Sequence, residues 1–444
     1  MRKKSFIMAA LASFIAFSSL PSFAAKPIDV LVIDSGSDFT HKELKPMANP
    51  NLAELKGTEK VDDDNNGYVD DVYGWNFVEN NSTIVNLTET PPEYDKVLEV
   101  MKNINKMQQS GKEAFTKEEW NAFVDLYNNP KLKPWVNFCG GWAHGTHCAG
   151  IIASNNKNVA FKAIRHIPTG KAPSRAEEDN FKKVSFKVAQ RTKRAAPTMD
   201  EIAQYFDEVG KENADKMKTK ADYIAKFNPR LINCSFGTPN QSVLQMMRLY
   251  SMQWGMGSLS DAEIQKLANL YVTKTMFPRD KVLFGGCKNA LVFIAAGNSA
   301  EDLDICTTSP QGVPMQNKVV VAATNDNQKM GYMSGTSMAC PNALGMASLV
   351  LTENPDLTPV QLKKILMETV DKKDWLKDKV KSGGVINVER AVYAAKQIKA
   401  GKSIAEAIKD AKEKVGDMAI KRGRKVGCDL KDPVVKKIYF SNVY

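Results

Sequence analysis

The sequence predicts an α/β fold, in which a doubly wound, mostly parallel sheet carries helices on both faces. The predicted strands are four short apolar runs, at residues 28–33, 231–234, 290–295 and 319–323. Unbroken runs of Val, Ile, Leu and Ala are typical of parallel strands that are buried on both faces. Helices that begin near His144 and Ser337 are expected to fill the crossovers. Ligands of such sheets bind at the carboxyl ends of the strands.

The first predicted strand ends at a carboxylate, in the segment Val-Leu-Val-Ile-Asp-Ser-Gly at residues 30–36. Asp34 in this segment can be a simple turn residue. Buried beside an imidazole, it would instead hold the ring in one tautomer and stabilise its charged form. An imidazole is offered by His-Gly-Thr-His-Cys-Ala-Gly at residues 144–150. Its two histidines are spaced by three and no Glu follows the first, so the pattern does not favour a zinc site.

Two further motifs supply an amide and a hydroxyl. Asn298 follows Gly297 in Ala-Ala-Gly-Asn-Ser at residues 295–299, where it is either a turn residue or a donor to an oxyanion. Ser337 lies in Ser-Gly-Thr-Ser-Met-Ala-Cys-Pro at residues 334–341. Because proline is tolerated in the first turn of a helix, Pro341 predicts that Ser337 lies at or beside a helix N-terminus. The helix dipole and the free N–H groups there favour a developing oxyanion.

In this chain order, the four segments resemble the active site of the subtilisin-like serine proteases, the subtilases. The resemblance covers about residues 28–398 and implies a subtilisin-type version of the α/β sheet. The roles that it implies are nucleophile for Ser337, general base for His144, orienting carboxylate for Asp34 and oxyanion donor for Asn298. His147 is then expected to be a packed or hydrogen-bonded helix residue.

The resemblance also implies a substrate-binding segment in Leu-Ile-Asn-Cys-Ser-Phe-Gly at residues 231–237. Its strand would pair with the substrate backbone, and Ser235, Phe236 and Gly237 would wall the primary specificity pocket. Further along, residues 354–359 and 382–387 resemble the closing segments of the family.

Three insertions interrupt the predicted peptidase domain, which spans residues 25–399. The insertions lie near residues 89–136, 169–227 and 238–283. Each contains a Ser/Thr-x-x-Glu pattern, the signature of a capping box, and is therefore expected to be partly helical; the patterns are at 116–119, 198–201 and 260–263. The insertions either form a rim that restricts the substrate or decorate the outside without a catalytic role.

The chain also departs from the family pattern at three other places. Only thirteen residues, 324–336, separate the last predicted strand from Ser337, and the usual Ala-Pro-Gly turn is absent. The Ser337 loop is therefore expected to be supported differently. Few residues precede the first strand, so we expect no propeptide, and the chain either folds unaided or has a separate folding partner or inhibitor. A basic extension with helical spacing at 404–418 and a possible strand at 434–444 occupies residues 400–444.

Residues 1–24 are expected to be an export signal, with three basic residues at 2–4, an apolar run at 6–20 and a small-x-small cleavage site at 22–24. The alternative is an uncleaved membrane anchor.

Removal of the signal takes away three positive charges and no acid, which lowers the formal net charge from +11 to +8. No later segment is a candidate membrane span. Basic stripes interleaved with aromatic residues are absent, so nucleic acid is not an expected partner.

The seven cysteines are an odd number, so at least one is expected to be unpaired within the monomer. Cys148 and Cys340 are expected to pack as small apolar groups on buried helix faces. Cys287 and Cys306 flank the strand that leads to Asn298, and they are the predicted disulfide pair.

An acidic segment, Asp-Asp-Asp-Asn-Asn-Gly-Tyr-Val-Asp-Asp at residues 62–71, resembles half of a calcium loop. The oxygen ligands of this loop would be Asp62, Asp64, Asn66 and Asp70. The final position is Tyr73 instead of the usual glutamate, so the segment is either an incomplete calcium site or an acidic turn. Such a calcium ion would be structural, because the serine chemistry requires no cofactor.

The sequence thus predicts an exported serine endopeptidase, periplasmic or extracellular, that hydrolyses proteins or peptides through an acyl-enzyme. The alternative is a subtilase-like protein that has lost efficient catalysis and binds peptides or a protein partner through the same cleft. The four retained residue types favour the enzyme. The deletion, the insertions and the missing propeptide favour the binding protein.

Overall fold

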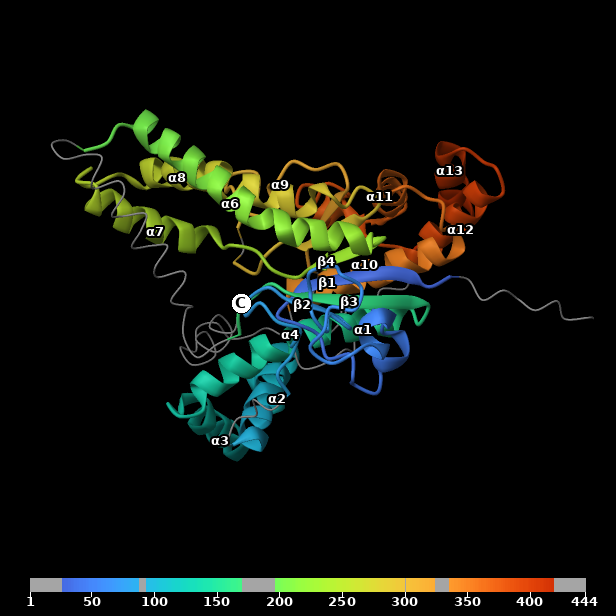
Figure 1. Ribbon diagram of the computed structural model, residues 1–444, viewed down its shortest axis with the longest axis horizontal. Helices are drawn as coiled ribbons and strands as arrows, with labels where there is room; N and C mark the ends of the chain where they lie inside the picture. The colour runs from blue at the N-terminus through green and yellow to red at the C-terminus, as the bar shows by residue number, and fades with distance from the viewer. Residues whose placement is uncertain (1–25, 88–92, 170–195, 300, 324–334, 419–444) are drawn as a thin grey trace, which may run out of the picture.

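A parallel sheet lies at the centre of the computed structural model of this chain, between two layers of helices (Figure 1). The structure describes residues 26–87, 93–169, 196–299, 301–323 and 335–418. The predicted export signal at 1–24 and the possible strand at 434–444 lie outside the described residues, as does most of the segment that precedes Ser337.

Within these residues the main sheet has six strands in the order β2-β3-β1-β4-β5-β6, and every neighbouring pair is parallel. The strands are β1 (Ile28–Asp34), β2 (Gly74–Asn76), β3 (Val159–Arg165), β4 (Leu231–Cys234), β5 (Leu291–Ala295) and β6 (Lys318–Val321). The predicted doubly wound sheet is thereby confirmed. The sequence did not indicate β2 or β3, because β2 has three residues and Lys162 and Arg165 interrupt the apolar pattern of β3.

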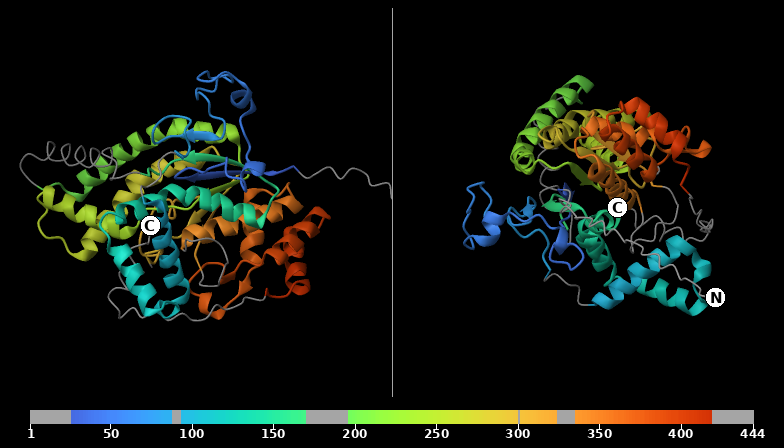
Figure 2. Two further views of the ribbon diagram at one scale, coloured as in Figure 1. Left: turned by 90° about the horizontal axis from the view of Figure 1, so that it is seen from below. Right: turned by 90° about the vertical axis from the view of Figure 1, so that its right-hand side faces the viewer.

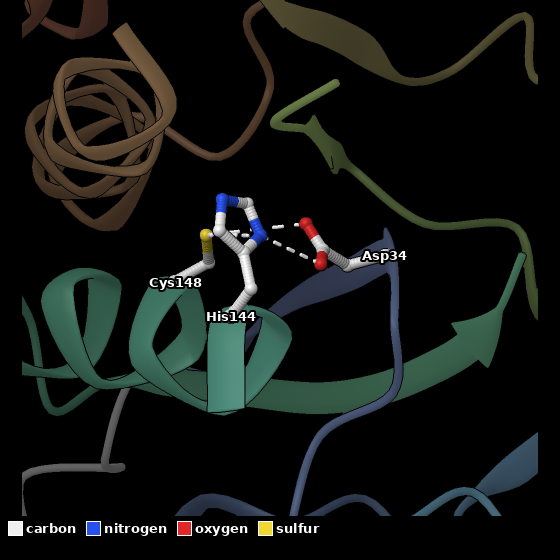
Figure 3. Close-up of side chains that lie close together, drawn as sticks. All are labelled: Asp34, His144 and Cys148. Atoms are coloured by element: carbon white, nitrogen blue, oxygen red, sulfur yellow. Dashed lines mark hydrogen bonds and ion pairs between the residues drawn. The ribbon is translucent and has the colours of Figure 1, made fainter. Parts of the chain in front are cut away.

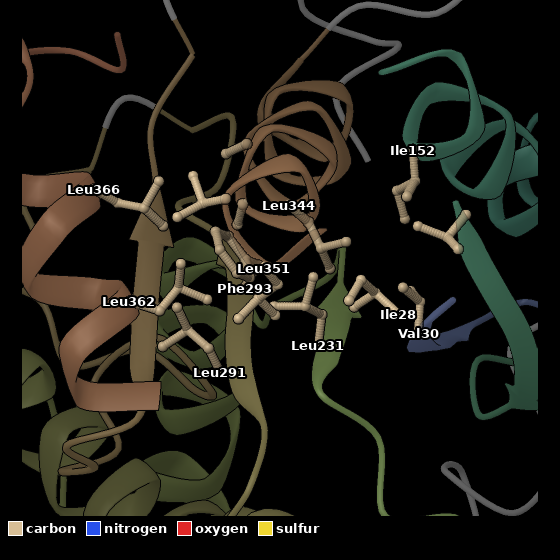
Figure 4. Close-up of a cluster of buried hydrophobic side chains, with 14 of the residues drawn as sticks. Ile28, Val30, Ile152, Leu231, Leu291, Phe293, Leu344, Leu351, Leu362 and Leu366 are labelled. Carbon is tan, nitrogen blue, oxygen red and sulfur yellow. The ribbon is translucent and has the colours of Figure 1, made fainter. Parts of the chain in front are cut away.

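Alternate residues of the strands are buried on opposite faces of this sheet. On one face Val30 and Phe293 belong to the same cluster as Leu344 of α10 (Thr336–Glu353), as Figure 4 shows. On the other face Ile33 and Ile294 are buried with residues of α6 (Met199–Phe227) and α9 (Phe277–Gly285). Burial on both faces is why β1, β4 and β5 are rich in apolar residues, and each buried Leu or Ile contributes about 1.5–3 kcal/mol.

The other α-helices surround this core. They are α1 (Leu52–Lys56), α2 (Tyr94–Ser110), α3 (Lys117–Asn128), α4 (Lys133–Asn155), α7 (Asn240–Gln253), α8 (Asp261–Tyr271), α11 (Pro359–Glu368), α12 (Val388–Lys399) and α13 (Ile404–Lys414). A two-stranded antiparallel sheet, β7 (Asp371–Lys372) and β8 (Gly384–Val385), lies between α11 and α12 in the chain. In Figure 2 the α2–α3 pair and the loop around α1 stand out from the sheet.

All three predicted capping boxes are formed. The hydroxyls of Thr116, Thr198 and Ser260 each accept a hydrogen bond from the backbone N–H three residues later, and the Glu side chain at that position accepts one in return. The boxes start α3, α6 and α8. The inserted helices also bury cores of their own, one around Phe123 in α3 and one around Phe206 in α6.

The helix that carries His144 is longer than the sequence indicated. It was expected to begin near His144, but α4 begins at Lys133, so His144 lies at its middle. A proline in the first turn is compatible with this early start. Phe138 and Cys139, in the first half of α4, are buried in the same cluster as Phe123 of α3. The first insertion therefore packs directly on the helix that positions His144.

The C-terminal part of the described chain covers one face of the sheet. The predicted helix of residues 404–418 is present as α13, which ends at Lys414 because Val415 adopts an extended backbone. Ala407 and Ile408 of α13 belong to the cluster that includes Leu344. None of the helices in the described ranges is both long enough and apolar enough to cross a membrane.

Candidate active site

A buried carboxylate and an imidazole meet at the carboxyl end of β1. Asp34 Oδ1 lies 2.8 Å from His144 Nδ1, and both side chains are labelled in Figure 3. The Asp34 side chain is fully buried, whereas 14% of the His144 side chain is exposed. The same oxygen of Asp34 accepts the backbone N–H of Ser35 at 2.7 Å. The carboxylate therefore contacts Nδ1 of His144, the ring nitrogen that faces away from the substrate in serine hydrolases.

The contact between β1 and α4 depends on Gly145, which has no side chain. Gly145 N–H donates to Ser35 Oγ at 3.2 Å, so the helix backbone touches the loop that follows Asp34. A Cβ atom on Gly145 would lie 2.1 Å from the Gly36 carbonyl oxygen and 3.0 Å from Asp34 Cβ. Only glycine permits this approach, and the approach sets the distance between Asp34 and His144.

Electrostatics distinguish the two histidines of the motif. Burial disfavours a charged His144, but the Asp34 carboxylate and then the Cys148 sulfur outweigh burial and hold the pKa of His144 well above its usual value. Burial and then the nearby His144 lower the pKa of His147 to about 4. Within the described ranges, His147 Nδ1 is buried without a hydrogen-bond partner. His144 is therefore the histidine that a carboxylate supports.

Ser337 lies in the first turn of α10, as predicted, because the helix begins at Thr336. Pro341 is deeper in the helix than the expected first turn. Since proline has no N–H, the carbonyl of Ser337, four residues earlier, cannot make its helical hydrogen bond. That carbonyl instead accepts Ser235 Oγ at 2.9 Å and lies 3.6 Å from Cys148 Sγ. Pro341 thus allows Ser235, which follows β4, and Cys148 of α4 to anchor the backbone of Ser337.

The Ser337 hydroxyl is directed at the substrate-binding segment. Its Oγ donates to the Ser235 carbonyl oxygen at 3.0 Å, and 9% of the residue is exposed. Among the described residues, Ser337 and His144 are not joined by a hydrogen bond; both contact Cys148 instead. Cys148 Sγ lies 3.9 Å from His144 Nδ1 and 4.0 Å from Asp34 Oδ2. The carboxylate, imidazole and thiol offer ligand atoms within 4.8 Å of one another, a set that could also hold a zinc ion.

The amide of Asn298 contacts Thr336, the residue that precedes Ser337. Asn298 Oδ1 accepts the N–H of Thr336 at 2.8 Å and its Oγ1–H at 3.0 Å. Gly335 makes this possible, because a Cβ atom there would lie 3.0 Å from Asn298 Oδ1, and its φ of +142° is one that other residues rarely adopt. With the amide oxygen held in this way, Nδ2 is the part of Asn298 that can donate to an oxyanion. No sequence pattern indicated the contacts of Thr336 with Asn298.

The predicted substrate-binding residues follow β4 directly. Ser235 contacts Ser337 through both its carbonyl and its hydroxyl. Phe236 packs its ring 5.3 Å from the ring of His166, and its carbonyl accepts Gln311 Nε2 at 3.3 Å. Gly237 lies against Gln311 as well. Of the three residues, Ser235 contacts Ser337, whereas Phe236 and Gly237 contact Gln311. No sequence pattern indicated the contacts of Gln311.

The predicted disulfide is wrong. Cys287 and Cys306 are both free thiols, Cys287 buried and Cys306 partly exposed. Cys287 lies in the core beneath α9, where burial raises its pKa to about 12. Cys287 and Cys306 flank the same strand in the sequence but are not paired in the fold. Cys148 and Cys340 are fully buried, as expected for packed thiols.

The acidic loop is organised by a carboxylate that the sequence did not indicate. Glu54 of α1 is 5% exposed, and its Oε1 accepts the N–H groups of Asp63 and Asp64 while its Oε2 accepts that of Asp70. Carboxylate oxygens of Glu54, Asp62 and Asp64 lie within 4.8 Å of one another. These hard oxygen donors suit a calcium ion.

The other two predicted calcium ligands are engaged within the loop. Asp70 is turned toward Lys60, whose N–H it accepts at 3.0 and 3.2 Å. Asn66 Oδ1 accepts the N–H of Tyr68 at 2.8 Å, and its Nδ2 donates to Asp64 at 3.1 Å. The structure therefore brings Asp62 and Asp64 together with Glu54, and not with Asp70.

Comparison with known proteins shows the family to which this chain belongs. The family model of the subtilases matches residues 26–329 and 311–388, and the chain belongs to the subtilase family. A curated relative, subtilisin-like protease 1 of Plasmodium berghei (strain Anka), is 25% identical over 382 residues, which cover 82% of this chain and 49% of the relative. Serine protease AprX of Bacillus subtilis (strain 168) is 43% identical over 60 residues, 14% of each chain. The chain spans about half the length of the Plasmodium relatives that it matches.

Among solved structures, a cold-adapted subtilisin-like serine proteinase matches with a TM-score of 0.37 and 18% identity, over 82% of this chain and 89% of that chain. The A-subunit of the AB5 toxin from E. coli matches with a TM-score of 0.38 and 16% identity, over 83% of this chain and 93% of that chain. Overall superposition is thus limited.

Proposed function

We propose that this chain is a serine endopeptidase that hydrolyses peptide bonds of protein or peptide substrates through an acyl-enzyme. The observation that carries the proposal is the buried Asp34–His144 pair, joined at 2.8 Å, beside Ser337 at the start of α10. Membership of the subtilase family and the position of Asn298 against Thr336 support it.

In the proposed reaction His144 Nε2 removes the proton from Ser337 Oγ, which attacks the carbonyl carbon of the substrate. For this step the hydroxyl must turn from the Ser235 carbonyl, which it contacts at 3.0 Å, toward the imidazole. The electron pair of the carbonyl moves onto its oxygen. Asp34 keeps a proton on Nδ1 and stabilises the imidazolium that forms.

Collapse of this intermediate breaks the C–N bond, and His144 returns its proton to the leaving amine. Water, deprotonated by the same imidazole, then hydrolyses the ester on Ser337. Asn298 Nδ2 donates a hydrogen bond to the oxyanion in both steps, at the start of a helix whose dipole has the same effect. Substrate backbone would lie along Ser235, Phe236 and Gly237.

A second function is favoured by one observation. The Ser337 hydroxyl is bonded to the Ser235 carbonyl instead of His144, which is the arrangement expected of a protein with weakened catalysis that binds peptides or a partner in the same cleft. Catalytic hydrogen bonds are often long or misaligned without substrate, so this arrangement is also compatible with the enzyme.

The two functions are separated by a fluorophosphonate probe, which forms a covalent bond only with an activated serine. An active protease takes the label at Ser337 and cleaves an unfolded protein, and Ser337→Ala abolishes both. Ser382→Ala, near the β7–β8 sheet, is the matched control that should retain both. A wild-type protein that takes no label and cleaves nothing across a broad peptide library has the binding function instead.

Two further proposals concern location and metal. Export to the periplasm or the outside of the cell is supported by the basic and apolar pattern of residues 1–24. A structural calcium ion is supported by the three clustered carboxylates of Glu54, Asp62 and Asp64. The calcium ion would stabilise the loop and take no part in the chemistry.

A further inference from the structure

A glutamine side chain bridges the ends of the two central strands beside the nucleophile. The β4–β5 ladder continues to Cys234 and Ile294. Just beyond it, Gln311 Nε2 donates to the Ala295 carbonyl at 2.7 Å and to the Phe236 carbonyl at 3.3 Å. A side chain from a later segment thus occupies the space between the two strand ends.

The gap between these strand ends is where an acylated substrate must place a side chain. Ser337 Oγ contacts the carbonyl of Ser235 on the β4 side, and Asn298 on the β5 side holds Thr336. In the acyl-enzyme, the carbonyl carbon of a substrate residue is bonded to Ser337 Oγ and its oxygen lies at Asn298. That substrate residue then lies between the Ser235 and Asn298 segments. The side chain of the residue on the acyl side of the cleaved bond is therefore directed into the gap that Gln311 occupies.

Gln311 is fixed in this position. Gln311 is 5% exposed, and the segment that carries it is tied to the substrate-binding strand, because Thr238 N–H donates to the Ser309 carbonyl at 2.9 Å. Ser309 Oγ donates in turn to Asp280 of α9 at 2.5 Å. Lys318 of β6 donates to the Gln311 carbonyl. These contacts hold the backbone of the segment, and a substrate that displaced the Gln311 side chain would also break its hydrogen bonds to the Ala295 and Phe236 carbonyls.

Gly237 provides an independent sign of this tight packing. A Cβ atom built on Gly237 would lie 2.0 Å from Gln311 Nε2 and 2.8 Å from its Oε1. Among the described residues, the Oε1 atom is itself buried without a hydrogen-bond partner. The carboxamide therefore leaves no room for a side chain at Gly237.

We propose that Gln311 is a specificity-determining residue, which closes the pocket for the acyl-side residue and restricts that residue to small side chains such as Gly, Ala or Ser. This inference rests on the proposed protease function. Bulky residues such as Leu and Phe would collide with the Gln311 carboxamide, and only the loss of this side chain would admit them.

The test uses a series of peptides that differ only at the acyl-side residue, Ala, Ser, Leu or Phe, with fluorophosphonate labelling in parallel. We expect wild-type kcat/KM for Ala to exceed that for Phe by about tenfold or more. Gln311→Ala should reduce this ratio at least about tenfold. Gln311→Met fills the same space without the hydrogen bonds and should keep the wild-type preference, as should the remote control Gln397→Ala on α12.

The outcomes separate this inference from the protease function. A wild-type enzyme that takes the label but cleaves after Phe or Leu as readily as after Ala overturns the role of Gln311 alone. A Gln311→Ala variant that takes the label but keeps the wild-type ratio of kcat/KM for Ala to that for Phe also overturns this role. Should Gln311→Ala fail to fold, Gln311→Asn, which shortens the chain by one methylene, must shift the ratio in the same direction. A wild-type protein without label or cleavage overturns both proposals.

Discussion

Gly145 and Gly36 are packed so closely that a methyl group on Gly145 would lie 2.1 Å from the Gly36 carbonyl oxygen. The two glycines come from α4 and from the loop after β1, and their contact sets the His144–Asp34 distance of 2.8 Å. The spacing of the Asp34–His144 pair is therefore decided by backbone packing as well as by the two side chains.

The first prediction concerns this contact. Gly145→Ala should push α4 away from the β1 loop, destabilise the fold by about 1–3 kcal/mol and reduce kcat about a hundredfold, because the His144–Asp34 geometry is lost. Gly150→Ala on the same helix is the matched control, since a Cβ atom there meets nothing within 4 Å. Steady-state kinetics and thermal unfolding measure both effects. Equal behaviour of the two variants would contradict the assignment.

The second prediction concerns pH. Asp34 holds the pKa of His144 above its usual value of 6.5, against the effect of burial, and the general base must be neutral. We therefore expect kcat/KM to rise with pH, with a midpoint above 6.5, and to level off in alkali. Asp34→Asn removes the charge, so the midpoint should move to lower pH while kcat falls by about 10⁴. A wild-type midpoint at or below 6.5 would refute this explanation.

The raised pKa of His144 also predicts the sign of a stability effect. Protonation stabilises the folded state, and this contribution is fully present below the unfolded-state pKa. It is lost as the pH rises through the folded-state pKa of His144. Between neutral and alkaline pH, the free energy of unfolding should therefore fall less for Asp34→Asn than for the wild type.

The third prediction concerns the oxyanion. Asn298→Leu should reduce kcat by about 10²–10³ with little change in KM, because one donor to the transition state is removed. Thr336→Val should cause a smaller loss, since Asn298 Oδ1 keeps the backbone N–H of Thr336 at 2.8 Å but loses the hydroxyl. Asn289→Ala, at a remote surface contact with Asn228, serves as the control. Comparable losses in all three variants would show that the effect is not specific to the oxyanion.

The fourth prediction concerns the thiols. Without reductant, an alkylating reagent should modify the partly exposed Cys306 of the native protein and leave the buried Cys287 unmodified. After unfolding, still without reductant, Cys287 should react as well; a disulfide would keep both residues unreactive until reduction. Alkylation should leave proteolysis largely intact, because burial raises the pKa of Cys340 and Ser337 is the proposed nucleophile. Mass spectrometry and peptide cleavage provide the two measurements.

The fifth prediction concerns calcium. If Glu54, Asp62 and Asp64 hold the ion, calcium should raise Tm and a chelator should lower it. Asp62→Asn should remove this response. Asp70→Asn should keep it, because the Asp70 carboxylate is bonded to Lys60 N–H. A Tm that does not respond to calcium in the wild type would leave the segment as an acidic turn.

The sequence was informative wherever the signal is local. Among the described residues, apolar runs indicated four of the six strands of the main sheet, since strands inside a sheet that is covered on both faces are rich in apolar residues. Three Ser/Thr-x-x-Glu patterns marked the starts of α3, α6 and α8, because a capping box involves residues only three apart. The sequence predicted that each of the four motifs lies at the end of a strand or on a helix. The predicted helix start at Ser337 is present, because α10 begins at Thr336.

Contacts between distant segments were decided by the tertiary structure. Asp34 and His144 are 110 residues apart, and Ser235 and Ser337 are 102 apart. No local pattern specified that α4 would start at Lys133, that the Ser337 hydroxyl would face Ser235, or that Cys287 and Cys306 would remain apart. The same holds for Glu54 in the acidic loop and for Gln311 between the strand ends. Local propensities and motifs select elements and residue types, whereas orientation and partners depend on how buried surfaces from the whole chain fit together.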